Sequence, residues 1–232
     1  MNQIINLFLG IATIVMNGAV GFSPINQKYD IDVTPSGGTF GIWSIIYSLL
    51  VLSLVQVKGE WSNIATFYFL VSCIANVSWL YLWGKEKIEY ANISLIVLPI
   101  SLILLWNNNR VNSNKIKNDY LMQNTIALYA GWTIGACLIN SFTTIKKNKL
   151  LLDGTINIAA IAFFCLSQIV WQVYGIIDGG SDFFKSSIAI PLVGIWTSLG
   201  IINNLSGNLK KLSYIYLATS SISLLHHLYR LS

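Results

Sequence analysis

Long uncharged runs alternate with short charged stretches along the whole of this 232-residue chain. A helix needs roughly 17 to 25 apolar residues to cross the hydrocarbon core of a bilayer. Eight uncharged runs meet or approach that length, and they cover residues 1–27, 33–57, 61–84, 90–109, 120–145, 154–177, 186–209 and 212–229. The pattern predicts an all-α integral membrane protein with about eight transmembrane helices.

Composition supports this prediction. Hydrophobic residues make up 54% of the chain and charged residues 10%, whereas soluble domains carry roughly 25% charged residues. The net charge is +5, but the basic residues lie in loops or at segment ends, which indicates anchoring at a lipid bilayer rather than nucleic-acid binding. They divide almost evenly between the two predicted sides, so neither the orientation nor the membrane is assigned.

Two absences in the sequence argue against a proton-coupled pump and against the common classes of enzyme. No Asp or Glu falls in the middle of a predicted span, which argues against a proton-coupled pump of the usual kind. No zinc spacing, phosphate loop, nucleophile elbow or paired carboxylate is present either. We therefore expect no enzyme, no catalytic residue and no metal site. The first apolar segment, 1–22, is expected to be a span, with a cleaved leader as the alternative.

The most specific stretch is "TPSGGTFGIWSIIY", which begins at residue 34 after a polar loop at 23–36. Pro35 suits a turn or a helix start, and Gly37 and Gly38 allow backbone geometries that other residues resist. A loop of this length is typical of either a lid or a plain surface connection. We expect it to act as a lid, closed by these turn residues.

Aromatic and amide side chains form stripes on three predicted helices. The stripes consist of Phe40, Trp43 and Tyr47; Asn76 and Trp79 in "ANVSW"; and Tyr129, Trp132, Ala136 and Asn140 in "LYAGWTIGACLIN". The spacings within each stripe are three, four or a multiple of a helical turn, so each occupies one helix face. Asparagines inside a membrane need partners, which favours an internal polar and aromatic chamber. The alternatives are an interfacial aromatic belt and simple helix–helix hydrogen bonds.

These elements, in this order, resemble the tryptophan-rich sensory protein family, also called TspO/MBR or the translocator protein family. The family has a five-helix membrane bundle with a long first loop that leads into P-P-x-W-x-F-G-x-x-W-x-x-L-Y. Pro35, Trp43 and Tyr47 match that motif, and Asn76 with Trp79 matches the family's L-N-x-x-W. Tyr129, Trp132 and Asn140 match its fifth-helix pattern.

The resemblance covers residues 1–145 and leaves three additional helices, at 146–232, without a role. It departs from the family pattern at Thr34-Pro35, where a double proline is usual, and at Gly37 or Gly38, where the first tryptophan is missing. Phe40 is also one position closer to Trp43 than in the shorter family members. These changes concern the ligand rather than the fold.

The resemblance implies a pocket, closed by the first loop, that binds a tetrapyrrole or a sterol-like lipid. The expected ligand-binding residues are Phe40, Trp43, Tyr47, Asn76, Trp79, Tyr129, Trp132 and Asn140, with Pro35, Gly37 and Gly38 in the lid. The function expected is sensing, transport or disposal of an apolar small molecule, with a tetrapyrrole as the one candidate cofactor-like ligand. The alternatives are a small transporter with a polar path through Gln168, Gln172, Asn203 and Asn204, or a structural subunit of a larger complex.

Two further signals leave alternatives open. Gly131 and Gly135 form a GxxxG spacing, which predicts close helix packing inside the chain, with a homodimer interface as the alternative. His226 and His227 are expected at the membrane interface beside Arg230, with ligation of a haem or chlorophyll metal as the alternative.

Overall fold

The computed structural model describes residues 2–20, 29–57, 61–111, 119–178 and 180–232. All regular structure in these ranges is helical: α1 (Asn2–Val20), the 3₁₀ helix η2 (Gly37–Gly41), α2 (Ile42–Gln56), α3 (Asn63–Gly84), α4 (Ile88–Val111), α5 (Tyr120–Lys147), α6 (Asp153–Asp178), α7 (Ser181–Ser187), α8 (Ala189–Asn204) and α9 (Gly207–Leu231).

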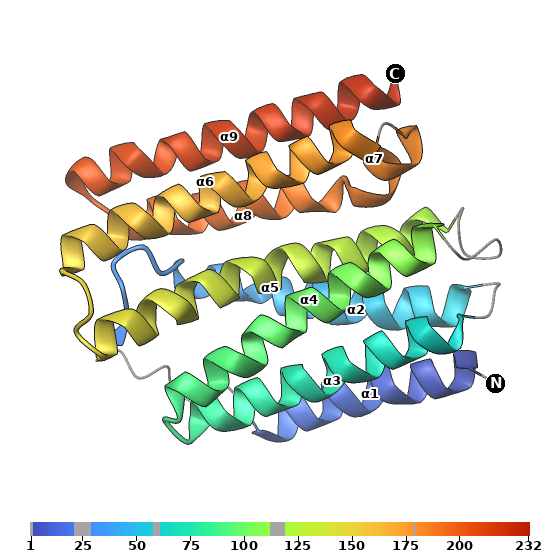
Figure 1. The fold of residues 1–232 in the computed structure, drawn as a ribbon. Helices are drawn as coiled ribbons and strands as arrows, with labels where there is room; N and C mark the ends of the chain where they lie inside the picture. The colour runs from blue at the N-terminus through green and yellow to red at the C-terminus, as the bar shows by residue number, and fades with distance from the viewer. Residues whose placement is uncertain (1, 21–28, 58–60, 112–118, 179) are drawn as a thin grey trace.

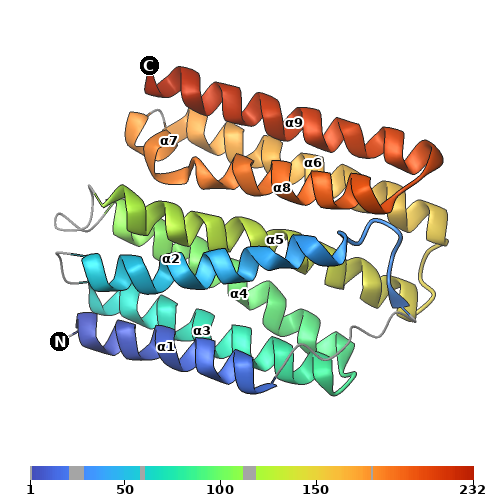
Figure 2. The ribbon, with the colours of Figure 1, turned by 180° about the vertical axis from the view of Figure 1, so that it is seen from behind.

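The long helices run side by side in one elongated bundle (Figure 1). α1 and α3 form one edge, α5 lies in the middle with α2 beside it, and α6, α8 and α9 form the opposite edge (Figures 1 and 2). The described parts of the two chain ends lie at the same end of the bundle. The segment that precedes α2 lies at the other end, between α5 and α8.

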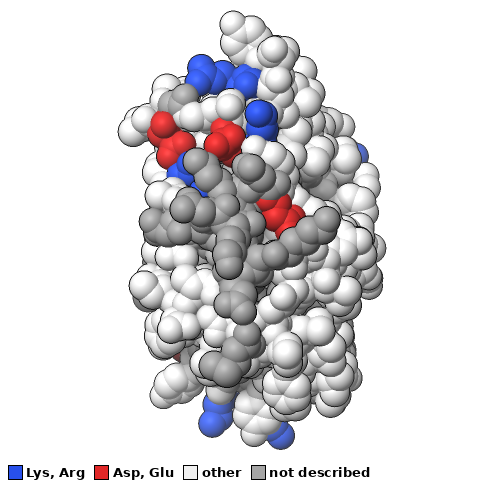
Figure 3. Space-filling model, turned by 90° about the vertical axis from the view of Figure 1, so that its right-hand side faces the viewer, with Lys and Arg blue, Asp and Glu red and all other residues white. Residues whose placement is uncertain are grey.

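The distribution of side chains is that of a membrane protein. Large apolar side chains such as Ile4, Phe8 and Leu225 face outward, while asparagines such as Asn6 and Asn76 are buried. Figure 3 looks onto the end of the bundle that carries both termini, and Lys, Arg, Asp and Glu side chains gather on its upper part. Lipid tails are as apolar as these side chains, so hydrophobic residues can face them without cost. Polar groups find no hydrogen-bond partner in lipid, so they are buried against other helices. The chain is an integral multi-pass membrane protein.

The number of spans differs from the expected eight. Within the described residues, six helices are long and apolar enough to cross a membrane, and a seventh span results if α7 and α8 count together. The helix expected within the uncharged run 186–209 forms as α8, but α7 precedes it and the two are bent by 41° at Ile188. Asn124 of α5 satisfies freed backbone groups there, since it accepts from the Ala189 N–H and donates to the Lys185 carbonyl.

The helix expected at 212–229 does form, as the 25-residue α9, but it is not among those six or seven. Its buried face is mostly polar and its outer face is apolar. The buried residues are Ser213, Tyr216, Ser220, Ser223 and His227. Serines that face other helices lower the average hydropathy of a segment without exposing polar groups to lipid, which explains why α9 falls short.

His227 is fully buried within the protein near the C-terminal end of α9, and its place at the membrane interface stays a prediction. Its Nδ1 atom lies 3.0 Å from the Gln172 amide nitrogen, and its Nε2 atom lies 3.3 Å from the Ser187 hydroxyl. Gln172 also donates to the Ser223 hydroxyl. These contacts join α6, α7 and α9, and Gln172 is one of the residues of the polar path expected for a transporter.

Candidate functional site

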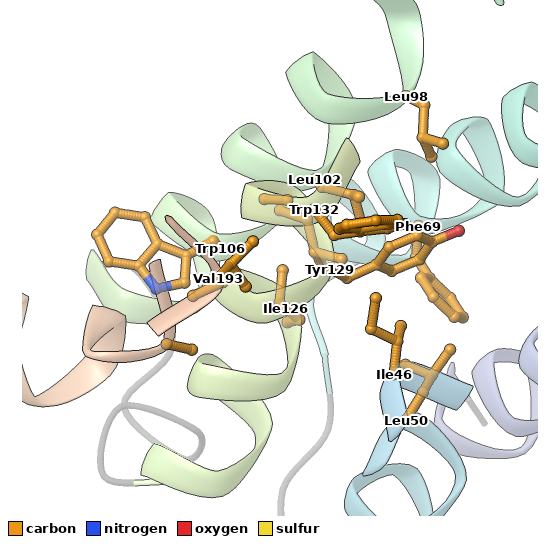
Figure 4. Close-up of a cluster of buried hydrophobic side chains, with 14 of the residues drawn as sticks. Ile46, Leu50, Phe69, Leu98, Leu102, Trp106, Ile126, Tyr129, Trp132 and Val193 are labelled. Atoms are coloured by element: carbon orange, nitrogen blue, oxygen red, sulfur yellow. The ribbon is translucent and has the colours of Figure 1, made fainter. Parts of the chain in front are cut away.

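Trp43 is the centre at which the three predicted stripes meet. Its ring is stacked on Tyr47 and on Trp79, with centroid separations of 5.4 and 5.9 Å. The edges of Tyr129 and Trp132 approach it at 5.8 and 6.3 Å. Figure 4 shows these last two residues projecting from α5 into the same part of the core. Edge and offset ring contacts of this kind each stabilise packing by roughly 0.5–1.5 kcal/mol.

A buried hydrogen-bond network closes the deep side of this cluster. The Asn17 amide donates to the Tyr47 hydroxyl at 2.5 Å and to the Asn76 Oδ1 atom at 2.9 Å. Asn76 in turn donates to the Tyr129 hydroxyl. The network thus ties α1, α2, α3 and α5 together. Sequence analysis missed Asn17, although the signal that singled out Asn76, an asparagine within an apolar helix, applies to it as well.

A pocket, which we call the inner pocket, lies on the other side of the aromatic cluster. Its lining consists of Asp30, Thr34, Pro35, Phe40, Trp79, Leu80, Trp83, Trp132, Gly135, Ala136, Ile139, Asn140, Thr143 and Thr197. Its cavity volume is about 60 Å³, well below the roughly 300–1,000 Å³ of small-molecule sites, so the pocket is a narrow slot.

The expected ligand-binding residues therefore divide into two groups. Four of them line the inner pocket directly, namely Phe40, Trp79, Trp132 and Asn140. The other four, Trp43, Tyr47, Asn76 and Tyr129, pack behind the pocket wall or join the buried network. Both groups follow from helix geometry. On α3 and α5 the stripes continue toward the lid end of the bundle, where Trp83 and Thr143 complete the lining.

Residues 30–40, which we call the strap, cover this end of the inner pocket. The "DIDVT" sequence alternates, so that Ile31 and Val33 are buried in the core. The Asp32 carboxylate accepts from the Asn157 amide at 2.8 Å, and the backbone N–H of Asp32 donates to Asn157 Oδ1 at 3.1 Å. The earlier part of the expected lid, 23–28, lies outside the described residues.

Helix α8 holds the other half of the strap. The Ser36 N–H donates to the Gly200 carbonyl at 3.0 Å, and the Trp196 indole N–H donates to the Thr39 carbonyl at 2.9 Å. A Cβ atom on Gly200 would collide with the Thr39 side chain, so a glycine is required for this close approach. The additional helices, which had no expected role, position the strap.

The strap separates the inner pocket from a wider outer pocket, which also opens between the strap and the turn before α9. The two pockets share Asp30, Thr34, Pro35 and Phe40. Gly37 lines the outer pocket, and neither Gly37 nor Gly38 has a positive φ or a close neighbour. These two glycines are thus part of η2, and their special backbone freedom is not used there.

The family model of TSPO-like proteins matches residues 3–229. The chain belongs to the TSPO-like protein family. The match includes α6 to α8 and nearly all of α9, beyond the five-helix core suggested by the motifs. No curated protein and no solved structure matches the chain. Whether residues 1–145 form a unit distinct from 146–232 stays a prediction.

Within this TSPO-like chain the GxxxG glycines serve internal packing. A Cβ atom on Gly131 would meet Ile190 and Val193 of α8, and one on Gly135 would touch Phe164 of α6. The spacing therefore lets α5 contact the C-terminal helices closely. A homodimer that uses another surface stays a prediction.

Proposed function

We propose that this protein binds a large, flat, apolar ligand in the inner pocket, for sensing, transport or disposal of that ligand. The observation that carries the proposal is that residues of all three motifs, Phe40, Trp79 and Trp132 with Asn140, line one pocket. Flat ring systems such as tetrapyrroles and sterols suit aromatic walls, with few polar groups needed to orient them.

Unsatisfied polar groups around the pocket support a role in binding. The indole nitrogens of Trp79 and Trp132 and the amide nitrogen of Asn140 are buried without a hydrogen-bond partner among the described residues. Leaving a buried donor unpaired costs about 1–3 kcal/mol. A ligand with acceptor atoms, or water in its absence, would offset that cost.

The slot must widen to accept such a ligand. Phe40 and Trp83 line it and are only partly buried, so their rings have room to rotate outward. Phe40 contacts the edge of Trp132 at a centroid separation of 5.6 Å. We expect this contact to open when a ring system enters.

The test is a titration of the purified protein in detergent with protoporphyrin and, separately, with cholesterol, followed by tryptophan quenching. Trp132→Phe and Asn140→Ala should each weaken the binding of the ligand that saturates by about tenfold. Trp61→Phe is the matched control, because Trp61 is buried beside Phe69 and is not part of the pocket lining. Failure of both ligands to saturate a folded protein would remove the proposal in favour of the transporter or subunit alternatives.

The transporter alternative gains little from the expected polar path. Gln168 packs against Gly194, Gln172 bonds to α9, and Asn204 donates to the Thr34 carbonyl of the strap. These side chains are engaged in contacts between elements. Asn203 is exposed.

A further inference from the structure

The described charged side chains that line the two pockets are all acidic. In the described part of the chain, the ionisable side chains that line the pockets are carboxylates: Asp30 lines both, and Asp32 lines the outer one. The described cationic side chains do not line either pocket. The carboxylate of Asp32 is bonded to Asn157, whereas that of Asp30 accepts no hydrogen bond from the described residues.

Lys146 of α5 is a described basic residue beside Asp30, but it bonds to the backbone of Asp30 rather than to the carboxylate. Its ammonium group donates to the backbone carbonyl of Asp30 at 2.6 Å and forms no ion pair with the carboxylate. Burial raises the pKa of the Asp30 carboxyl, and the charge of Lys146 opposes that rise. Within the described residues, the carboxylate is thus partly desolvated and without an ion-pair partner, so it can accept from a ligand.

Aromatic rings share the inner pocket with this carboxylate. Phe40, Trp79, Trp83 and Trp132 are all part of the lining. The faces of such rings attract cations, most strongly for tryptophan, and aromatic cages are a usual means of binding quaternary ammonium groups. The Asp30 carboxylate and the tryptophan rings therefore both favour a cationic ligand. They disfavour a ligand that ends in a carboxylate.

We infer that the inner pocket prefers an apolar cation: a flat hydrocarbon body among the tryptophans with an amine or quaternary ammonium group at Asp30. This inference rests on the proposed function, and it narrows the ligand class. Neutral sterol-like molecules bind more weakly, and anionic ligands, tetrapyrroles with ionised propionates included, bind weakest. The attraction is local, because Asp30 lies at the boundary between the two pockets.

The experiment uses three steroids with the same ring system that end in a dimethylamino group, a hydroxyl group or a carboxylate. Each is titrated at pH 7.5 into the full-length protein in an uncharged detergent. The amine should bind about tenfold more tightly than the alcohol, and the carboxylate should bind least well. Asp30→Asn should abolish the preference for the amine and leave the affinity for the alcohol within about twofold.

Asp153→Asn is the matched control, since it removes one carboxylate from an exposed position at the start of α6. It should preserve the preference for the amine. Binding of the alcohol with no preference for the amine, or a preference that survives in Asp30→Asn, would overturn the inference and leave the proposed function intact. If none of the three steroids binds to a protein with an unchanged thermal midpoint, the inference fails, and the proposed function fails as well only if protoporphyrin does not bind either.

Discussion

The N-terminal helices α1 to α5 and the C-terminal helices α6 to α9 both bury polar side chains, but they use them differently. In the first group, Asn17 and Asn76 bond to tyrosine hydroxyls directly behind a pocket wall. In the second group, Gln172, Ser223 and His227 link one helix to the next. Buried polar side chains thus link helices in both regions, but only in the first do they lie directly behind the wall of the inner pocket.

Among the variants that test this difference between the two regions, Asn76→Leu is expected to have the largest effect. The substitution leaves the Tyr129 hydroxyl without its buried donor and removes one of the two acceptors of the Asn17 amide, so the free energy of unfolding should fall by about 2–3 kcal/mol. Thermal unfolding in detergent measures this. Thr219→Ala is the control, because the Thr219 hydroxyl lies outside the network and donates to the Ile215 carbonyl of its own helix. Equal thermal midpoints for both variants would show that the network is dispensable.

Ser220→Leu tests the second region. The Ser220 hydroxyl lies against the position of Gly194, where even a Cβ atom would not fit. Overpacking should lower the free energy of unfolding by about 2 kcal/mol and leave ligand affinity unchanged. A loss of affinity that matches the loss of stability would contradict the separate roles of the two regions.

A pair of glycine substitutions tests the contact between the regions. Gly200→Ala places a methyl group against Thr39 and should loosen the strap, which weakens ligand binding by about fivefold. Gly37→Ala lies on the strap itself and meets open space, so it should have no effect. Ligand titrations of the two variants decide this. Equal affinities would mean that docking on α8 does not matter for binding.

The smallest effect expected is that of Asp30→Asn on stability. Because burial raises the pKa of Asp30 against the opposing effect of Lys146, the contribution of this group is present below its unfolded pKa, near 4. It is lost as the pH rises through the folded value. The variant should therefore be more stable than the native protein at pH 7, by about 0.5 kcal/mol once solvent screening is included. Asp32 stays hydrogen-bonded to Asn157 in both proteins.

Unfolding at pH 4 and pH 7 measures this difference, which should shrink at the lower pH. A carboxylate that slightly destabilises the protein is expected at a binding site rather than in a structural role. Destabilisation of Asp30→Asn at pH 7 would assign Asp30 a structural role instead.

Much of the fold could be predicted from the sequence, because hydrocarbon requires long apolar helices with their polar residues inside. The helices that carry the stripes form as expected, and helical spacing places Trp79, Trp132 and Asn140 on one pocket. Their neighbours Asn76 and Tyr129 belong to the same stripes, but whether a stripe residue lines a pocket or packs behind it depends on how neighbouring helices cross. A single helix face does not contain that information.

Other features depend on contacts distant in the sequence. The docking of the strap joins Thr39 to Trp196, and Thr34 to Asn204, and no local pattern predicts such pairs. The break at Ile188 forms where Asn124 satisfies the backbone. The mean hydropathy of α9 does not show that its serines lie on one face. Only the packing of that face against other helices shows why a serine-rich segment belongs in the bundle.

The attachment of the strap to α8 has a consequence for biosynthesis. Thr39 and Trp196 are 157 positions apart, and a ribosome adds roughly 5–20 residues per second. For some seconds during synthesis, α2, α3 and α5 can pack together while the residues that secure the strap have not been made. The N-terminal helices can thus pack together before the strap is docked, and docking has to wait until the last third of the chain has been made.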